Sequence, residues 1–374
     1  MKRIAQVTHN YLPHLGGIEF YVKRLFEDLA RSNNGFIVDI LTTDLDTPTL
    51  NRKEEARYFP VDVAFMRNPF STRLVSHLRK HPYDLMHLHS IWFLPCLLAV
   101  IFRKRARIIT TIHGVFPDKA SILLRLFLSL YKPLALYILK CSDRIVVLSE
   151  SERRKLLNHF SIEAENVVVI PNGICIEAHE PVEKESIVLF TGRIIPDKNP
   201  DVLIEAVAKL KNRISSLRIV FVGPIEESYR IELMQLAQNL KVATLIEFVA
   251  PLDQSFPEEK ALLMNLYRRA KVFVSLGAWE GLPTRIMEAM QFETACITYS
   301  SGGSSDLVID GYNGIVIVEL DAELLASRLE KVLLNDDFRA TLGINARKTI
   351  LEKYDWNKIS QKLISLYEEI LGHY

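Results

Sequence analysis

The fold of this chain is decided at residues 272–290, which read VFVSLGAWEGLPTRIMEAM. The apolar run 272–276 is typical of a short buried strand. Pro283 then predicts the start of a helix, because a proline at the first helical position lacks only an N–H group that would be unpaired anyway. A strand that leads through a short loop into a helix is the kind of junction at which α/β proteins bind ligands. We therefore expect a ligand site here.

Two glutamates beside this junction indicate the kind of ligand. The free N–H groups and positive dipole end of a helix N-terminus favour an anion such as a phosphate. Glu280 and Glu288 add hydrogen-bond acceptors suited to hydroxyl groups. Phosphate and hydroxyl groups together describe a nucleotide sugar. The further residues expected to bind this donor are Gly281, Leu282, Pro283 and Thr284.

The same pair of glutamates has two other interpretations. The spacing also arises by chance on solvated helix faces. On one helix the two carboxylates would lie about 12 Å apart along the axis, whereas a retaining glycosidase needs roughly 5 to 5.5 Å between its carboxyl groups. The spacing therefore favours ligand binding over glycoside hydrolysis.

A second loop of this kind is predicted at residues 189–200, which read LFTGRIIPDKNP. A strand is expected to end at Arg193, and a helix to begin with Asn199 as its cap and Pro200 as its first residue. Arg193 and Lys198 then bracket the loop. A guanidinium fork and an ammonium suit a diphosphate, and they can stabilise a departing phosphate in place of a metal. Ordinary solvation of the loop is the alternative.

The first half of the chain offers a glycine pair and a histidine. Gly16 and Gly17 follow the first predicted strand, where paired glycines allow backbone N–H groups to approach a ligand. Their adjacency does not fit the dinucleotide-binding fingerprint, which spaces its glycines. His113 ends the predicted strand 107–112 and is expected to point into a cleft between two domains, where it could hydrogen-bond a sugar hydroxyl. A plain turn and a satisfied strand-end histidine are the alternatives.

No metal site is expected. His87 and His89 point the same way along a predicted strand, but no third ligand stands at a suitable spacing. Asp44 and Asp46 have the Asp-x-Asp form of metal-dependent sugar transferases, and we interpret them as a solvated loop. The cysteines are scattered and indicate reduced thiols in a cytoplasmic protein; they are Cys96, Cys141, Cys175 and Cys296.

Strand-like and helical runs alternate along almost the whole chain, which predicts parallel sheets with crossover helices. A break at residues 171–173 and the polar stretch 177–186 divide the series. We expect an acceptor-side domain at 1–178 and a nucleotide-sugar-binding domain at 179–354, with helix 355–374 packed back on the first. The expected strands are 3–7, 37–41, 61–66, 85–88, 107–112, 144–148 and 167–170, followed by 187–190, 218–222, 245–249, 272–276, 295–299 and 314–318.

The first half is basic, since residues 1–180 carry 24 Lys and Arg against 18 Asp and Glu. Two apolar runs there, 91–102 and 121–139, lack the roughly 20 uncharged residues of a membrane span. We interpret them as helices packed on a sheet. The alternative is that basic residues and exposed leucines on these helices contact an anionic membrane. No signal peptide precedes the first predicted strand.

Taken together, the motifs resemble family four of the glycosyltransferases, the retaining group with a GT-B fold. The resemblance covers nearly the full chain, and its order makes coincidence very unlikely. The motifs that carry it are residues 16–19, 111–114, 142–144, 170–173, 192–193 with Lys198, 280–289, 302–303 and 311–314.

The resemblance implies two doubly wound Rossmann-like domains with the active site in the cleft between them. Glu288 would bind the ribose and Glu280 the donor sugar. Arg193 and Lys198, with Gly192, would bind the diphosphate, which Gly16 and Gly17 would approach from the other domain. His113 would lie near the transferred sugar. The donor would be a UDP- or GDP-sugar, with no metal and no other cofactor.

The acceptor implied is a glycan, a lipid-linked glycan or a small molecule, and the cellular place is the cytoplasm or the inner face of the membrane. No nucleic-acid partner is implied. Residues 291–295 and Asp306 depart from the common family pattern, which puts the donor's identity in doubt more than activity. Two other functions stay open: a non-catalytic sugar-nucleotide-binding subunit of a transferase complex, and a sugar-nucleotide epimerase on the same fold.

Overall fold

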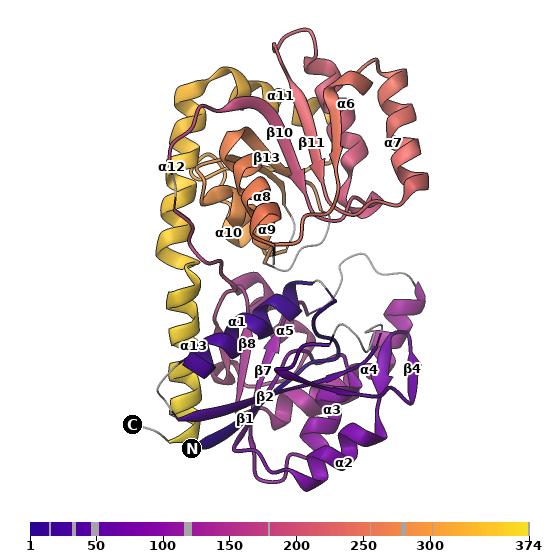
Figure 1. The fold of residues 1–374 in the computed structure, drawn as a ribbon, viewed down its shortest axis with the longest axis vertical. Coiled ribbons are helices and arrows are strands. Elements are labelled where there is room, and N and C mark those ends of the chain that lie inside the picture. Colours follow the sequence, from indigo (N-terminus) through magenta and orange to yellow (C-terminus); the bar gives the residue numbers. More distant parts are fainter. Residues whose placement is uncertain are drawn as a thin grey trace. The chain divides into compact units, whose positions relative to one another are not determined.

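The computed structural model describes residues 1–14, 16–31, 35–45, 52–115, 122–178, 180–254, 256–277, 282–300 and 302–372. The chain forms two compact units (Figure 1). Unit 1 comprises Met1–Asn172 and Asn357–Tyr374, and unit 2 comprises Gly173–Trp356. Unit 1 is thus built from both ends of the chain.

Unit 1 has a seven-stranded sheet in the order β3-β2-β1-β6-β7-β8-β9, and every neighbouring pair is parallel. Helices cover both faces of such a sheet, so its central strands are buried on both faces rather than alternately buried and exposed. All four residues of β6 are buried, for example. The strands are β1 Lys2–Val7, β2 Phe36–Thr43, β3 Ala56–Phe59, β6 Leu85–Leu88, β7 Arg107–Ile112, β8 Arg144–Val147 and β9 Val167–Val169.

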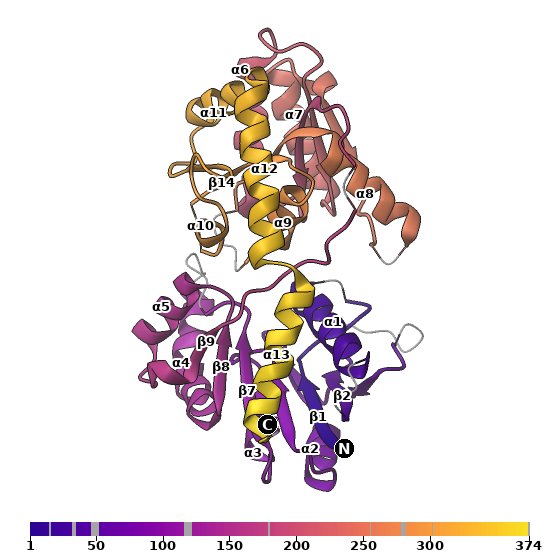
Figure 2. The ribbon, with the colours of Figure 1, turned by 90° about the vertical axis from the view of Figure 1, so that its left-hand side faces the viewer.

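The helices of unit 1 include the last helix of the chain, α13, which Figure 2 shows in front of β1 and β7. Its buried face carries Ile359, Leu363 and Tyr367. The Tyr367 ring lies 6.5 Å from that of Phe36 on β2. The helices are α1 Gly17–Arg31, α2 Thr72–Lys80, α3 Leu94–Ile101, α4 Ile122–Cys141, α5 Glu150–His159 and α13 Trp356–Leu371, with a short 3-10 turn at Ala164–Asn166.

The prediction of a further parallel strand at residues 61–66 is wrong. Strand β4, Val63–Phe65, pairs antiparallel with β5, Asn68–Phe70, in a separate two-stranded hairpin. Met66 and Arg67 make the turn, with φ of 50° and 61°. Left-handed φ at both turn residues is the geometry that folds a chain directly back on itself. The sheet position is filled by β3 instead, which the sequence pattern did not reveal.

Unit 2 has a six-stranded parallel sheet in the order β12-β11-β10-β13-β14-β15. The strands are β10 Glu185–Thr191, β11 Arg218–Val222, β12 Ile246–Val249, β13 Ala270–Ser275, β14 Ala295–Tyr299 and β15 Ile315–Ile317. The helices are α6 Pro200–Leu210, α7 Glu227–Asn239, α8 Pro257–Arg269, α9 Thr284–Met290, α10 Ser304–Leu307, α11 Ala322–Leu334 and α12 Asp336–Lys353, with 3-10 turns at Pro196–Lys198 and Ala243–Leu245.

Both sheets reverse their strand order at one point. In unit 1 the chain runs outward from β1 to β3 and then returns to β6 on the other side of β1. In unit 2 it runs from β10 to β12 and returns to β13 beside β10. Open α/β sheets bind ligands at the carboxyl ends of the strands where the order reverses. The fold class expected from the sequence, two doubly wound α/β domains, is confirmed.

Candidate functional site

In unit 2 the loops that follow β10 and β11 lie against each other without side chains between them. Gly192 has a φ of +116° and Gly223 a φ of +147°, a region that L side chains rarely adopt. A Cβ on Gly223 would lie 2.0 Å from the carbonyl oxygen of Gly192. The Gly192 N–H also donates to the carbonyl of Val222, at 2.9 Å. The two loops therefore form one fixed edge beside the reversal point of the sheet, which lies between β10 and β13.

The loop of residues 193–199, which we call the basic loop, follows this edge. Arg193 is exposed, and Lys198 is half-buried at the end of the turn Pro196–Lys198. The expected capping role of Asn199 is wrong in part. Asn199 does hold the N-cap position of α6, but its φ is 51° and its side chain makes no cap bond. Its amide instead donates to the carbonyl of Leu276, at 2.7 Å. This bond fastens the basic loop to the end of β13.

Glu288 lies on α9 with its carboxylate buried among three donors. The Tyr267 hydroxyl donates to Oε2 at 2.9 Å, and Arg285 Nη1 donates to the same oxygen at 2.9 Å. Gln254 Nε2 donates to Oε1 at 3.2 Å. The charge of Glu288 raises the pKa of Arg285 above its ordinary value. Glu288 and Arg285 thus form an ion pair whose carboxylate is buried and whose guanidinium is partly exposed.

Tyr267 joins this carboxylate to the basic loop. Burial and the nearby Glu288 charge raise the pKa of Tyr267 well above its usual value, so its hydroxyl stays protonated. That hydroxyl lies 2.9 Å from Glu288 Oε2 and 2.8 Å from the Thr191 hydroxyl. Because Thr191 immediately precedes Gly192, the phenol connects Glu288 to the strand end that carries Arg193. The structure therefore brings together predicted residues of two separate sequence motifs.

The helix N-terminus expected at Pro283 is displaced by one residue. Pro283 occupies the N-cap position with extended backbone, and α9 begins at Thr284. Leu282 and Pro283 are buried, and Thr284 is half-buried. Glu280 and Gly281 lie outside the described residues.

In unit 1 the glycine pair stands at the start of α1, with Gly16 before the helix and Gly17 as its first residue. A Cβ on Gly16 would lie 2.4 Å from Glu19 Oε2, whereas a Cβ on Gly17 would meet open space. Glu19 is buried, and its Oε1 lies 2.9 Å from His14 Nδ1. The absence of a side chain at Gly16 thus makes room for a carboxylate of the chain itself.

His113 follows β7 and belongs to a row of three imidazoles. The ring centroids of His87 and His89 are 4.3 Å apart, and those of His89 and His113 are 5.7 Å apart. The Tyr21 ring of α1 meets His113 edge-on at 4.9 Å. Burial lowers the pKa of His87 and of His113 to about 3, and that of His89 well below its usual value. These imidazoles are therefore neutral at neutral pH.

The ring nitrogens of His87 and His89 are bonded to the protein. His87 hydrogen-bonds the Tyr367 hydroxyl through Nδ1 and the Thr111 hydroxyl through Nε2, at 2.6 Å for the latter. His89 Nε2 lies 2.6 Å from Gln6 Oε1. Within the described ranges of the chain, no group of His, Cys, Asp or Glu side chains has the arrangement of a metal site.

The Asp-x-Asp motif is only partly described, because Asp46 lies outside the described residues. Asp44 lies in a loop and is partly exposed, as expected, but its carboxylate is bonded to the protein rather than only to solvent. Its Oδ2 accepts from Arg52 at 2.8 Å, and its Oδ1 accepts from the backbone N–H of Val61 at 2.9 Å. These bonds hold the segment before the β4–β5 hairpin.

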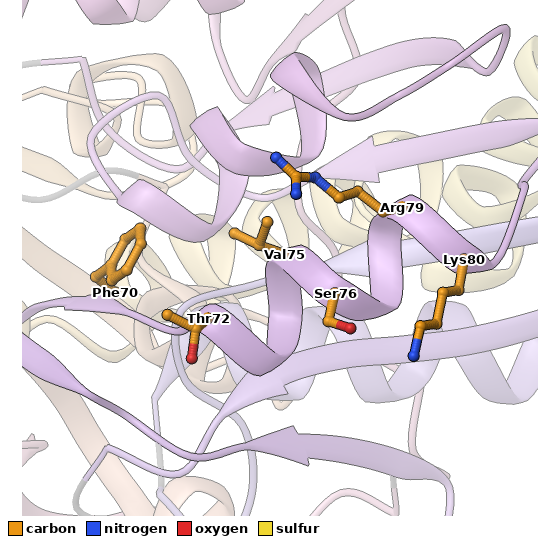
Figure 3. Close-up of a pocket in the computed structure, with 6 residues that line it drawn as sticks. All are labelled: Phe70, Thr72, Val75, Ser76, Arg79 and Lys80. Carbon is orange, nitrogen blue, oxygen red and sulfur yellow. The ribbon is translucent and has the colours of Figure 1, made fainter.

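A hollow of about 450 Å³ lies along α2 and contains none of the expected site residues. Figure 3 shows its side chains, with Val75 and Arg79 on one face of the helix. Arg79 lies over the Phe102 ring at 4.7 Å. This hollow therefore adds nothing to the site at the carboxyl ends of the strands.

Several residues that complete the hydrogen bonds around Glu288 and around the row of histidines were not identified from sequence. In unit 2 these are Thr191, Gln254, Tyr267 and Arg285, and in unit 1 they are Gln6, Thr111 and Tyr367. Arg285 stood three residues before Glu288, a spacing that places both on one helix face and could have indicated the pair. The others act across long sequence separations and leave no local pattern.

Comparison with known proteins matches two family models, which together span most of the chain. The model "Glycosyltransferase Family 4" matches residues 15–178, and "Glycosyl transferases group 1" matches residues 175–349. A relative in Escherichia coli, UDP-Gal:alpha-D-GlcNAc-diphosphoundecaprenol alpha-1,3-galactosyltransferase, is 25% identical over 399 residues, covering 99% of this chain and 97% of that protein.

Solved structures share the fold over the whole chain. Sucrose-phosphate synthase from Thermosynechococcus elongatus superposes with a TM-score of 0.78 and 22% identity, covering 100% of both chains. Anabaena HepE, solved in complex with UDP-glucose, superposes with a TM-score of 0.77 and 18% identity, covering 99% of this chain and 100% of that one.

Proposed function

The chain belongs to glycosyltransferase family 4 and has the GT-B fold, and from that premise we propose that it moves a sugar from a nucleotide-sugar donor to an acceptor with retention of anomeric configuration. The donor is a UDP- or GDP-sugar, and the acceptor is a lipid-linked glycan. The name of the E. coli relative, which pairs UDP-Gal with a diphosphoundecaprenol acceptor, supports this choice. The HepE complex with UDP-glucose supports the nucleotide.

The observation that carries the proposal is the arrangement around Glu288. A carboxylate has about four lone-pair sites, and three donors of the protein occupy three of them. The site left over suits a ribose hydroxyl. The Gln254 bond is the longest of the three at 3.2 Å, so a second hydroxyl can displace it at little cost.

The diphosphate is assigned to the basic loop. Arg193 and Lys198 lie beyond the fixed glycine edge, and Asn199 fastens their loop to the end of β13. A guanidinium and an ammonium held on a rigid loop stabilise the charge that develops on the departing phosphate without a metal. Gly192 lets the backbone approach the diphosphate. The adjoining wall of the site is assigned to Leu282, Pro283 and Thr284.

Unit 1 supplies the acceptor side in this proposal. Gly17 presents open backbone at the start of α1, and His113 meets the transferred sugar. Glu280 binds the hydroxyls of the donor sugar. The acceptor hydroxyl attacks on the face that the leaving phosphate departs from, and the phosphate takes its proton. Such a mechanism requires no protein base beside the sugar.

The test begins with a thermal-shift screen of nucleoside diphosphates and their sugars, because a ligand of the native state raises the melting temperature. The best donor then enters a transfer assay with a diphosphoundecaprenol-linked sugar, and NMR determines the anomeric configuration of the product. Arg193→Ala should lower kcat/KM by roughly 100-fold or more. Arg213→Ala is the matched control, because Arg213 is an exposed arginine of unit 2 paired with Glu330.

The outcome also separates the alternatives. Donor binding without transfer by the purified chain would favour a non-catalytic subunit, and an epimerised donor formed without acceptor would favour an epimerase. An inverted product would contradict retention. Full activity in both Arg193→Ala and Lys198→Ala would contradict the assignment of the basic loop.

A specific surface supports a membrane location for this reaction. Helix α4 carries Arg125, Lys132 and Lys140 and no acidic residue. Leu126, Leu130, Leu134 and Tyr137 are exposed on it at spacings of three to four residues, which places them on one face. None of the helices within the described ranges is both long and apolar enough to cross a bilayer. We propose that α4 lies on an anionic membrane where the lipid-linked acceptor resides.

The neighbouring elements extend this surface. Val63 and Phe65 of the β4–β5 hairpin are also exposed, and the Phe65 ring lies 6.0 Å from Phe127 of α4. Near the end of α4, a hollow of about 450 Å³ is lined by Lys140 and a basic turn. That turn consists of Arg103, Lys104 and Arg105, with Arg107 close by.

Flotation with phosphatidylglycerol vesicles tests the membrane surface. The wild-type chain should float with these vesicles and not with phosphatidylcholine vesicles, and Leu130→Ser with Phe65→Ser should weaken flotation. Leu334→Ser is the matched control, because Leu334 is an exposed leucine of unit 2. Equal flotation of all variants, or none by the wild type, would exclude the surface while leaving the transfer reaction untouched.

A further inference from the structure

The row of histidines continues into a chain of hydrogen bonds that ends on the C-terminal helix. Tyr367 of α13 is bonded to Gln6 of β1, whose Nε2 lies 2.9 Å from the hydroxyl, and to His87 of β6. Gln6 is bonded in turn to His89. His89 Nδ1 lies 3.4 Å from His113 Nε2. Tyr367, Gln6 and His87 lie on α13, β1 and β6, whereas His89 and His113 directly follow β6 and β7. All of these residues belong to unit 1.

The direction of each bond follows from the Gln6 amide. An amide oxygen only accepts, so His89 must carry its proton on Nε2. His89 is neutral, because burial lowers its pKa, and its Nδ1 is therefore an acceptor. The facing Nε2 of His113 then donates to it. A distance of 3.4 Å is long for such a bond, but hydrogen bonds at unliganded sites commonly tighten when ligand binds.

The other branch runs the opposite way from the same amide. The Gln6 NH₂ group donates to the Tyr367 oxygen at 2.9 Å. The Tyr367 O–H is then free to donate to His87 Nδ1, and His87 Nε2–H donates to the Thr111 hydroxyl at 2.6 Å. Tyr367 stays protonated because burial raises its pKa well above the usual value. The orientation of the Gln6 amide thus determines which ring nitrogen carries the proton in His87, His89 and His113.

Reversal of the amide would reverse every one of these bonds. The Tyr367 hydroxyl both accepts and donates, so it makes the His87 branch and the His89 branch change direction together. Without that oxygen the buried NH₂ group of Gln6 loses its acceptor, and the two branches are no longer coupled. An unpaired buried donor is costly, so Gln6 would then turn between two orientations.

We propose that Tyr367 is a positioning residue that fixes the proton of His113 on Nε2, so that Nδ1 of a neutral His113 accepts a hydrogen bond from a sugar hydroxyl. The proposal rests on the proposed function in one respect, namely that His113 meets the sugar. Within the described part of the chain, no group is bonded to Nδ1 of His113. The hydrogen bond expected between His113 and a sugar hydroxyl is then one that His113 accepts.

The test is Tyr367→Phe, which keeps the ring and removes the hydroxyl. NMR of the chain labelled with ¹⁵N-histidine reports which nitrogen of each ring is protonated. The signals of His113 are identified as those that disappear in the His113→Asn variant. The wild type should show a single His113 tautomer protonated at Nε2. Tyr367→Phe should show both tautomers and a kcat lowered roughly tenfold, with KM for the donor changed by less than about twofold.

Leu363→Ala is the matched control, because Leu363 is fully buried on the same helix and lies outside the hydrogen-bonded chain. It should lower the melting temperature and leave the His113 tautomer single. A wild-type His113 protonated at Nδ1 would overturn the proposal, and so would a Tyr367→Phe variant with an unchanged tautomer and kcat. The NMR readout needs no substrate, so absent transfer by the wild type would defeat the proposed function and not this assignment.

Discussion

The buried polar groups of the two units solve the same physical problem in opposite ways. In unit 2 the Glu288 carboxylate is paired with the Arg285 guanidinium, with a nitrogen–oxygen distance of 2.9 Å. In unit 1 the three imidazoles of the row His87, His89 and His113 carry no charge at neutral pH, and burial holds the pKa of His87 near 3. A charge is retained in a protein interior where a counter-charge and hydrogen bonds meet it, and otherwise the group becomes neutral.

Because of this difference, the two units are suited to different roles in the proposed reaction. A carboxylate paired with an arginine is a strong hydrogen-bond acceptor, which suits the proposed contact with ribose hydroxyls. A neutral network fixes the direction of each proton, which suits the proposed orientation of a sugar. The two sheets reverse their strand order in the same manner, so the difference comes from the side chains and not from the fold.

Acidification should have the largest effect, which is a loss in the free energy of unfolding that arises from the buried histidines of unit 1. The folded-state pKa of His87, about 3, lies below the ordinary 6.5. The unfolded chain therefore binds more protons between these values. The stabilisation is complete above about pH 6.5 and is lost as the pH falls toward 3. Each fully buried histidine should lower the free energy of unfolding by about 1.4 kcal/mol per pH unit below 6.5, as measured by urea unfolding.

Two variants control the acid experiment. His159→Gln replaces an exposed histidine and should leave the pH slope unchanged. His89→Gln removes one of the buried titrating rings and should make the slope shallower. A slope that is the same in all three proteins would show that the histidines are not the origin of the acid sensitivity.

Glu288→Ala should have the next largest effect, because it removes the acceptor assigned to the ribose and leaves Arg285 without its partner. We expect kcat/KM to fall by roughly 100-fold or more. The fold should persist, since the Arg285 side chain is 37% exposed and can reach water. Glu330→Ala is the control, because it breaks the Arg213–Glu330 ion pair on the surface of the same unit. Comparable losses in both variants would contradict the assignment.

Tyr267→Phe should have an intermediate effect. It removes the hydroxyl that lies between Glu288 and Thr191 and keeps the ring in place. We expect a roughly tenfold loss in kcat/KM and about 1 to 2 kcal/mol of stability. Tyr312→Phe, at an exposed position, should change neither. Activity unchanged in Tyr267→Phe would mean that the phenol does not join Glu288 to the basic loop.

Gln254→Ala should have the smallest effect. Its bond to Glu288 is the longest of the three, and the proposed ribose hydroxyl can take its place. We expect kcat/KM to change by less than about threefold, as one weak hydrogen bond implies. A loss as large as that of Tyr267→Phe would show that Gln254 itself binds the donor.

The sequence predicted the architecture well, because parallel sheets leave a strong local signal. Buried strands are mainly apolar and alternate with amphipathic helices, and both parallel sheets follow that pattern. The failures occurred where local signals compete. Residues 61–66 have a strand pattern, but the left-handed turn at Met66 and Arg67 pairs them in a hairpin.

The candidate site was predictable only where one motif contains the partners. Glu288 was identified from its own helix, whereas Tyr267 joins it from 21 positions away. His87 and His89 stand two positions apart, and this spacing placed both rings on one side of their strand. Tyr367, however, lies 280 positions from His87. Asn199 was expected to cap a helix, and the carbonyl of Leu276 takes its amide instead. Tertiary contacts of this kind leave no trace in local sequence.

The composition of unit 1 from both ends of the chain bears on how the protein is made. A ribosome releases the chain from the first residue onward, and domains tend to fold as they emerge. Residues 173–356 can assemble during synthesis, whereas the first 172 residues must wait for the last helix to supply Tyr367. In nascent chains stalled before position 357, one face of the unit 1 sheet would therefore lack its covering helix. We expect chaperones to bind such chains.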